Sequence, residues 1–180
     1  AQFVHYRLNE FVDKGLSGII GYPVPQIGHV EFNAEASAEW SWNAKGRSPH
    51  EFAMSWAVRH GMKDPGLFAE WSDIHGPVAW DVYGSEWPSG NTRKFPGPMA
   101  DLLKAGKLPE LGDILWEVYP IPWGDIKSVE QLDRDVKDAE RSVQLARQMG
   151  IEQFVQESLV IQGYMQAIKA LWELKHLVKP

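Results

Sequence analysis

The spacing of apolar residues along the chain predicts a helix followed by two strands. Apolar side chains recur at helical intervals over residues 2–14, and Gly15 follows as a helix stop. Residues 16–22 are almost purely apolar, as is typical of a parallel strand that is covered on both faces. In residues 38–43, Trp40 and Trp42 alternate with polar residues, and this pattern predicts a second strand.

Helical patterns dominate the rest of the chain. Ser48, Pro49 and Glu51 form a capping signature for a helix that ends at Gly61. The other predicted helices run from about residue 64 to a break at Gly76 and Pro77, over residues 98–105 and 109–118, from Ser128 to Gly150, and over residues 151–177. We expect the last two to pack as antiparallel neighbours. The predicted fold class is therefore α/β followed by all-α.

Composition narrows the classes of function. The chain has 180 residues, 44% of them hydrophobic, and a net charge of −6, so it can bury a core and has no basic patch for nucleic acid. It contains no cysteine, which excludes disulfides, zinc–thiolate sites and cysteine nucleophiles. Its 6 histidines show no metal-ligand spacing. No apolar run reaches the roughly 20 residues of a membrane span. We expect no metal, no cofactor, no nucleic acid and no membrane.

Side chains suited to a sugar gather where the two predicted strands end. Aromatic rings pack on the C–H faces of a pyranose, whereas carboxylates and amides hydrogen-bond its hydroxyls. The predicted substrate-binding residues are Tyr22, Asn33, Glu35, Trp40, Trp42 and Asn43. The alternative for Trp40 and Trp42 is that each is an ordinary core residue of a buried strand. His29 is either a ligand contact or a solvated loop residue.

Glu35 and Glu39 are closely spaced carboxylates beside aromatic residues. They are the candidates for the acid and nucleophile of a two-carboxylate glycosidase, although the sequence assigns neither firmly. Hydrogen bonding to substrate is one alternative role. A structural ion pair with Lys45 or Arg47 is another.

Residues 18–23, 33–36 and 39–43 resemble the last two strands of a glycosidase (β/α)8 barrel, or TIM barrel. The resemblance is to the hexosaminidase-like families, which include the O-GlcNAcase and hyaluronidase group and the α-N-acetylglucosaminidases. It implies that residues 1–62 are the C-terminal portion of a catalytic barrel and that residues 63–180 form an α-helical C-terminal domain. It also implies that the six substrate-binding candidates lie on the C-terminal rim of the barrel, where barrel enzymes place their active sites.

The resemblance implies a function as part of a larger glycoside hydrolase that uses substrate-assisted catalysis. Its partners would be a carbohydrate substrate and the remainder of the barrel, supplied by missing sequence or by another chain. Those families carry their acidic pair on a strand that this chain lacks, and Tyr22 stands where they have Asn. A periplasmic or secreted location is favoured, although the sequence does not fix the compartment.

Two other interpretations remain open. In the first, the chain is a non-catalytic helical module that binds carbohydrate or a partner protein, with Trp80, Tyr83, Trp87 and Trp123 as an exposed platform. In the second, the chain is a self-contained α/β enzyme whose subunits complete a shared sheet. The first interpretation predicts sugar binding without additional strands.

Overall fold

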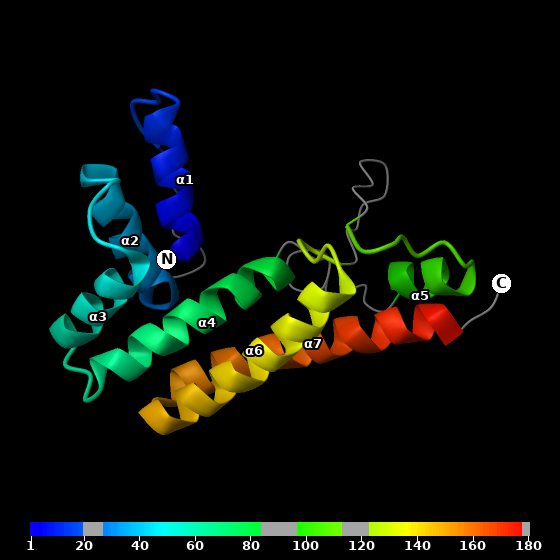
Figure 1. Ribbon diagram of the computed structural model, residues 1–180. Coiled ribbons are helices and arrows are strands. Elements are labelled where there is room, and N and C mark those ends of the chain that lie inside the picture. Colours follow the sequence, from blue (N-terminus) through cyan, green and yellow to red (C-terminus); the bar gives the residue numbers. More distant parts are fainter. Residues whose placement is uncertain (20–26, 84–96, 113–122, 178–180) are drawn as a thin grey trace. The chain divides into compact units, whose positions relative to one another are not determined.

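The computed structural model describes residues 1–19, 27–83, 97–112 and 123–177. Seven helices and no strand lie within these residues (Figure 1). They belong to two compact units, Ala1–Pro77 and Val78–Pro180. The described part of the chain is therefore all-α, and the predicted α/β class is wrong.

All but the last residue of the second predicted strand belongs to helix α2, which runs Ile27–Trp42. Within it, Trp40 is completely buried whereas Trp42 is 92% exposed. Positions two residues apart lie on the same face of a strand but about 200° apart around the axis of a helix. The helix therefore separates two tryptophans that a strand would place on one face. The nearby alanines, which have the highest helix propensity, favour the observed helix.

The first predicted strand is also absent where the structure describes it. Residues 16–19 have no regular secondary structure, and residues 20–22 lie outside the described residues. The described residues thus contain no strand from which a (β/α)8 or TIM barrel is built. The predicted likeness to the barrel of hexosaminidase-like glycoside hydrolases is therefore wrong, and so is the expected barrel rim.

The first unit consists of α1 (Gln2–Asp13), α2, α3 (Pro49–Arg59) and the first part of α4 (Pro65–Tyr83). Helix α1 packs against α2. The interior is rich in aromatic rings whose centroids lie 5.1 to 5.7 Å apart, in tilted, edge-to-face and stacked arrangements. These rings belong to Phe32, Trp40, Phe52, Trp56, Phe68 and Trp71.

Helix α3 begins as the sequence predicts. The Ser48 hydroxyl accepts a hydrogen bond from the Glu51 backbone N–H, and the Glu51 carboxylate accepts one from the Ser48 backbone N–H. These two bonds satisfy donors that would otherwise lack partners at the first turn. Gly61 follows the helix with a φ of 67°, which glycine adopts without steric cost. The predicted capping box is confirmed.

The predicted break at Gly76 and Pro77 does not occur, because α4 continues through Pro77. A proline inside a helix removes one backbone hydrogen bond. Apolar side chains on both sides of it are nevertheless buried, including Phe68 before the proline and Val82 after it. The burial of these side chains offsets the lost hydrogen bond. Gly76 and Pro77 in the sequence indicate a helix break, but they do not indicate how much apolar surface the continued helix buries.

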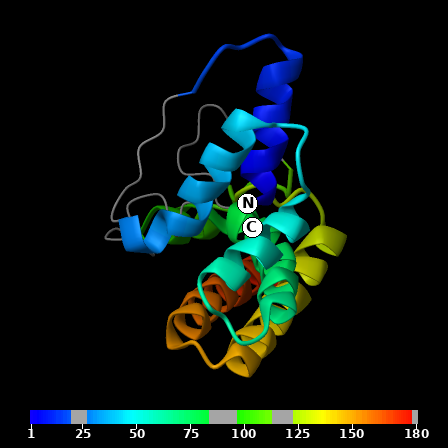
Figure 2. The same cartoon turned by 90° about the vertical axis from the view of Figure 1, so that its left-hand side faces the viewer.

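The second unit is organised on an antiparallel helical hairpin. Helices α6 (Val129–Met149) and α7 (Glu152–Leu177) lie side by side in Figure 1, and Figure 2 shows the tight turn between them. Gly150 makes this turn with a left-handed φ of 69°. The core of the unit comprises Val78, Val82, Leu108, Trp123, Ile126, Leu132, Ala139, Met165 and Ile168. The predicted hairpin is confirmed.

Helix α5 (Gly97–Lys104) also matches its prediction to within one residue at each end. The helix predicted over residues 109–118 does not form at residues 109–112. Its remainder lies outside the described residues.

Candidate functional site

The two tryptophans nominated for sugar binding lie in opposite environments. Trp40 is buried in the first unit, where its indole N–H donates to the Arg47 carbonyl oxygen at 2.9 Å. Its ring contacts His5 and Phe52, so the structure supports the alternative of a core residue. Trp42 is almost fully exposed one half-turn away on α2. The two rings therefore do not form one platform.

The nominated amides are also on the surface of the first unit. The Asn33 side-chain oxygen accepts a hydrogen bond from the Ala1 amino group at 2.9 Å. Asn43 is exposed just after the end of α2. Tyr22 and the side chain of His29 lie outside the described residues. Sugar binding by these residues stays a prediction.

The nominated carboxylates point to different arginines. Arg47 Nε donates to Glu39 Oε1 at 2.7 Å, and Arg59 Nη2 donates to Glu35 Oε2 at 2.7 Å. Glu39 thus forms the structural ion pair with Arg47 that was one of the alternatives. A catalytic role for either carboxylate stays a prediction.

Glu35 lies at the centre of a polar cluster between α2 and α3. Trp56 Nε1 donates to Glu35 Oε1 at 3.0 Å. His60 Nδ1 donates to the Trp56 carbonyl oxygen at 2.9 Å, and the two rings stack with centroids 3.8 Å apart. His60 Nε2 then lies 3.7 Å from Glu35 Oε1 and 3.9 Å from Glu31 Oε1. Two carboxylates and one imidazole nitrogen therefore face a common point.

Sequence reasoning identified Glu35 but missed its partners. Glu31 and Glu35 are four residues apart, as are Trp56 and His60, and this spacing places each pair on one helix face. A strand over residues 38–43 leaves Glu31 and Glu35 in the connection that precedes it, where their spacing carries no information. The spacing becomes informative once α2 is recognised as a helix.

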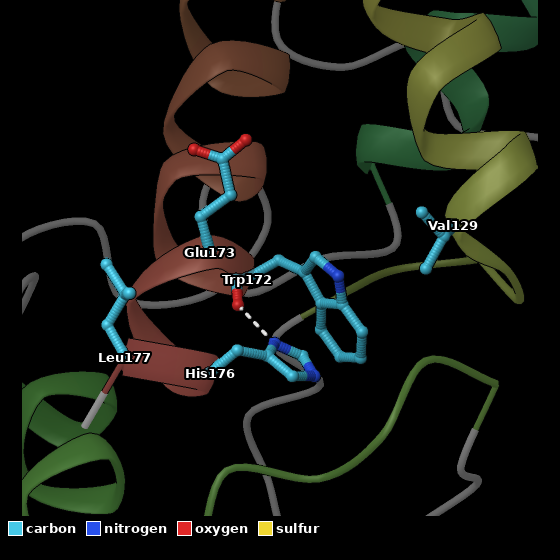
Figure 3. Close-up of a pocket in the computed structure, with 5 residues that line it drawn as sticks. All are labelled: Val129, Trp172, Glu173, His176 and Leu177. Carbon is cyan, nitrogen blue, oxygen red and sulfur yellow. Dashed lines mark hydrogen bonds between the residues drawn. The ribbon is translucent and has the colours of Figure 1, made fainter. Parts of the chain in front are cut away.

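A hollow of about 500 Å³ lies at one end of the α6–α7 hairpin (Figure 3). Its lining residues are Val129, Trp172, Glu173, His176 and Leu177. In Figure 3 the Trp172 and His176 rings extend from α7 toward the side on which Val129 lies. The hollow thus combines aromatic and aliphatic surfaces with an imidazole and a carboxylate.

The Trp172 ring is held in place from several directions. Trp123 packs edge-on against it with the centroids 5.5 Å apart, and the Lys175 ammonium lies 4.8 Å from its centroid. Lys175 is itself fixed by a 2.9 Å hydrogen bond to the Pro109 carbonyl oxygen and by an ion pair with Glu110. A binding surface on Trp172 would therefore be largely preformed.

His176 is oriented by the backbone of its own helix. Its Nδ1 donates to the Trp172 carbonyl oxygen at 2.9 Å (Figure 3). A carbonyl oxygen cannot donate, so the proton of the neutral imidazole is on Nδ1, and in that form Nε2 carries a lone pair. Nε2 can therefore accept a hydrogen bond from a ligand hydroxyl.

The exposed platform proposed from the sequence is wrong at Trp123. That side chain is only 2% exposed, and its indole N–H donates to the Pro109 carbonyl oxygen at 3.0 Å. Trp80 is 38% exposed. Trp87 and the side chain of Tyr83 lie outside the described residues.

A second carboxylate cluster lies inside the second unit. Asp135 is 2% exposed, and burial together with the nearby charge of Asp81 raises the pKa of its carboxyl to about 6. Burial also raises the pKa of Asp81, which accepts a 3.0 Å hydrogen bond from Gln131 Nε2. The direction follows from the cost of placing two negative charges together away from water.

Comparison with known proteins adds no relative: no family, no curated protein and no solved structure matches this chain. Among the described helices, none has the length and apolar character required to span a lipid bilayer.

Proposed function

We propose that the chain is a non-catalytic helical module that binds a carbohydrate in the hollow beside Trp172. The observation that carries this proposal is the combination of a positioned indole and a positioned imidazole around an open space of about 500 Å³. This volume lies within the range of small-molecule sites, which is roughly 300 to 1,000 Å³. It is large enough for one or two sugar rings.

The chemistry of the lining suits a sugar better than a wholly apolar ligand. Val129 and the Trp172 ring offer apolar surface to the C–H faces of a pyranose. His176 Nε2 offers an acceptor for a hydroxyl, and the exposed Glu173 carboxylate offers further acceptors at the rim. Few polar groups on an otherwise apolar wall are the usual composition of such a site.

Hydrolysis of glycosidic bonds by a larger protein was inferred from a barrel, and the described residues contain no strand of one. A binding role requires no additional strands. It is therefore the alternative that the helical structure supports better.

Binding is expected to be weak, because an open hollow leaves part of the ligand in water. A dissociation constant on the order of 1 mM corresponds to about −4 kcal/mol. We would test it by saturation-transfer NMR with a panel of methyl glycosides of glucose, galactose, N-acetylglucosamine and glucuronic acid. We expect at least one of them to receive saturation from the protein.

His176→Ala should weaken the binding of that glycoside about fivefold, because it removes an acceptor and part of the wall at a cost near 1 kcal/mol. His50→Ala is the matched control, since His50 is also a surface histidine but belongs to the first unit. The proposal fails if no glycoside binds, or if both variants change binding equally.

A further inference from the structure

We propose that Glu31, Glu35 and His60 form a binding site for a divalent transition-metal ion of the zinc type. This site lies in the first unit, so it goes beyond the sugar-binding proposal and does not depend on it. No cofactor or metal was expected from the sequence, because the histidines show no metal-ligand spacing. Glu31 and Glu35 lie on α2, and His60 follows the last residue of α3.

The distances between the ligand atoms suit a shared ion. One ligand atom from each of the three residues can be chosen so that all lie within 4.8 Å of one another. His60 Nε2 is 3.7 Å from Glu35 Oε1 and 3.9 Å from Glu31 Oε1, which is too long for a hydrogen bond. Ligands about 2.1 Å from a tetrahedral zinc ion lie roughly 3.4 Å apart. Glu31 is exposed, so its side chain can rotate to bring its oxygen closer to the other two ligand atoms.

The histidine is presented in the tautomer that a metal requires. Its Nδ1 proton is donated to the Trp56 carbonyl oxygen, so the neutral imidazole carries its lone pair on Nε2, the atom that faces the two carboxylates. The stacked Trp56 ring, 3.8 Å away, fixes the plane of the imidazole. A backbone carbonyl on the distal nitrogen is the usual support of a metal-bound histidine.

The central carboxylate is supported in the same way. Trp56 Nε1 donates to Glu35 Oε1, and Arg59 Nη2 donates to Glu35 Oε2. These donors hold the carboxylate in position, and Oε1 retains a second lone pair for a metal. The charges of Glu31, Glu35 and Arg59 add up to −1, so the site attracts a divalent cation.

The ligand types select the class of metal. Imidazole and carboxylate ligands in a set of three, with a further position left to water, are typical of zinc. Magnesium and calcium instead prefer shells of six or more oxygens. We therefore expect zinc to bind more tightly than either.

The test is a calorimetric titration of the whole chain with zinc chloride at neutral pH, in a buffer that does not chelate metals. We expect one ion per chain. Glu31→Gln should weaken binding about tenfold, because it removes the charge of one ligand, and His60→Gln about a hundredfold, because it removes the imidazole nitrogen. His50→Gln is the matched control, because its ring pairs with Asp73 elsewhere in the same unit; it should leave zinc binding unchanged.

Glu31 is exposed, so its substitution keeps the test valid even if His60→Gln disturbs the stacking on Trp56. The proposal is overturned if the chain binds no zinc, or if neither variant weakens the binding. It is also overturned if magnesium or calcium chloride binds as tightly as zinc chloride. Failure of glycoside binding would leave this result unaffected.

Discussion

A carboxylate in the first unit, Glu35, and one in the second, Asp135, lie in opposite environments. In the first unit the Glu35 side chain is 35% exposed and receives hydrogen bonds from Trp56 and Arg59. In the second unit Asp135 is 2% exposed and faces the carboxylate of Asp81. A surface carboxylate keeps its charge at little cost and can offer it to a ligand, whereas a buried pair destabilises the fold when both members ionise.

The interiors differ as well. The first unit is held by packed aromatic rings, and the second by a hairpin whose core is largely aliphatic. A buried serine pair, with Ser142 Oγ donating to Ser158 Oγ at 2.9 Å, crosses that hairpin. The difference implies that substitutions in the aromatic interior act mainly through packing, whereas a substitution of Asp135 also changes how stability depends on pH.

The largest effect is expected in the aromatic interior. Trp40→Ala should destabilise the first unit by about 4 kcal/mol, because it leaves a large cavity and an unpaired Arg47 carbonyl oxygen. Trp42→Ala, two residues away and almost fully exposed, should change stability by less than about 0.5 kcal/mol. Urea unfolding followed by circular dichroism measures both. Equal effects would contradict the assignment of Trp40 to the core.

The next effect concerns the buried carboxyl pair. The pKa of Asp135 is raised to about 6 in the folded chain, above the ordinary value of about 3.9, so the folded state holds this proton more tightly than the unfolded state. The contribution of this carboxyl to stability is therefore fully present below about pH 4 and is lost as the pH rises through about 6. One pKa unit corresponds to about 1.4 kcal/mol, so the loss is on the order of 3 kcal/mol at most.

Asp135→Asn should remove this dependence and stabilise the second unit by about 2 kcal/mol near pH 7. Thermal unfolding over a pH series, with the variant compared with the parent chain, isolates the contribution of this one group. Asp138→Asn on the same helix is the control. If the parent chain gained stability relative to Asp135→Asn as the pH rose through this range, the buried pair would not be the cause.

The smallest effect is expected at the start of α3. Ser48→Ala removes the hydroxyl that caps the Glu51 backbone N–H and should destabilise the first unit by about 1 kcal/mol. Ser41→Ala, at an exposed position on α2, should have almost no effect. Urea midpoints for the two variants make the comparison. An equal loss of stability in the two variants would show that contacts of exposed serines in general, and not the helix cap, provide the stabilisation.

The candidate sites were only partly predictable. Glu35 was identified from its position beside aromatic residues, but its ligand partners Glu31 and His60 were not, because their convergence depends on two helices packing together. The hollow beside Trp172 was missed for the same reason: Val129 belongs to a different helix and is distant in sequence. The burial of Trp123, which excludes it from an exposed platform, is likewise a product of tertiary packing.

The sequence by itself determined the helices whose ends depend on a few neighbouring residues. The Ser48 cap, the Gly61 stop and the Gly150 turn depend on backbone hydrogen bonds and on the φ angle of glycine, and both are decided within a few residues. Only the tertiary structure decided that residues 38–42 form a helix and that α4 passes through Pro77. In both cases the local pattern fitted two conformations, and burial of large apolar side chains selected between them.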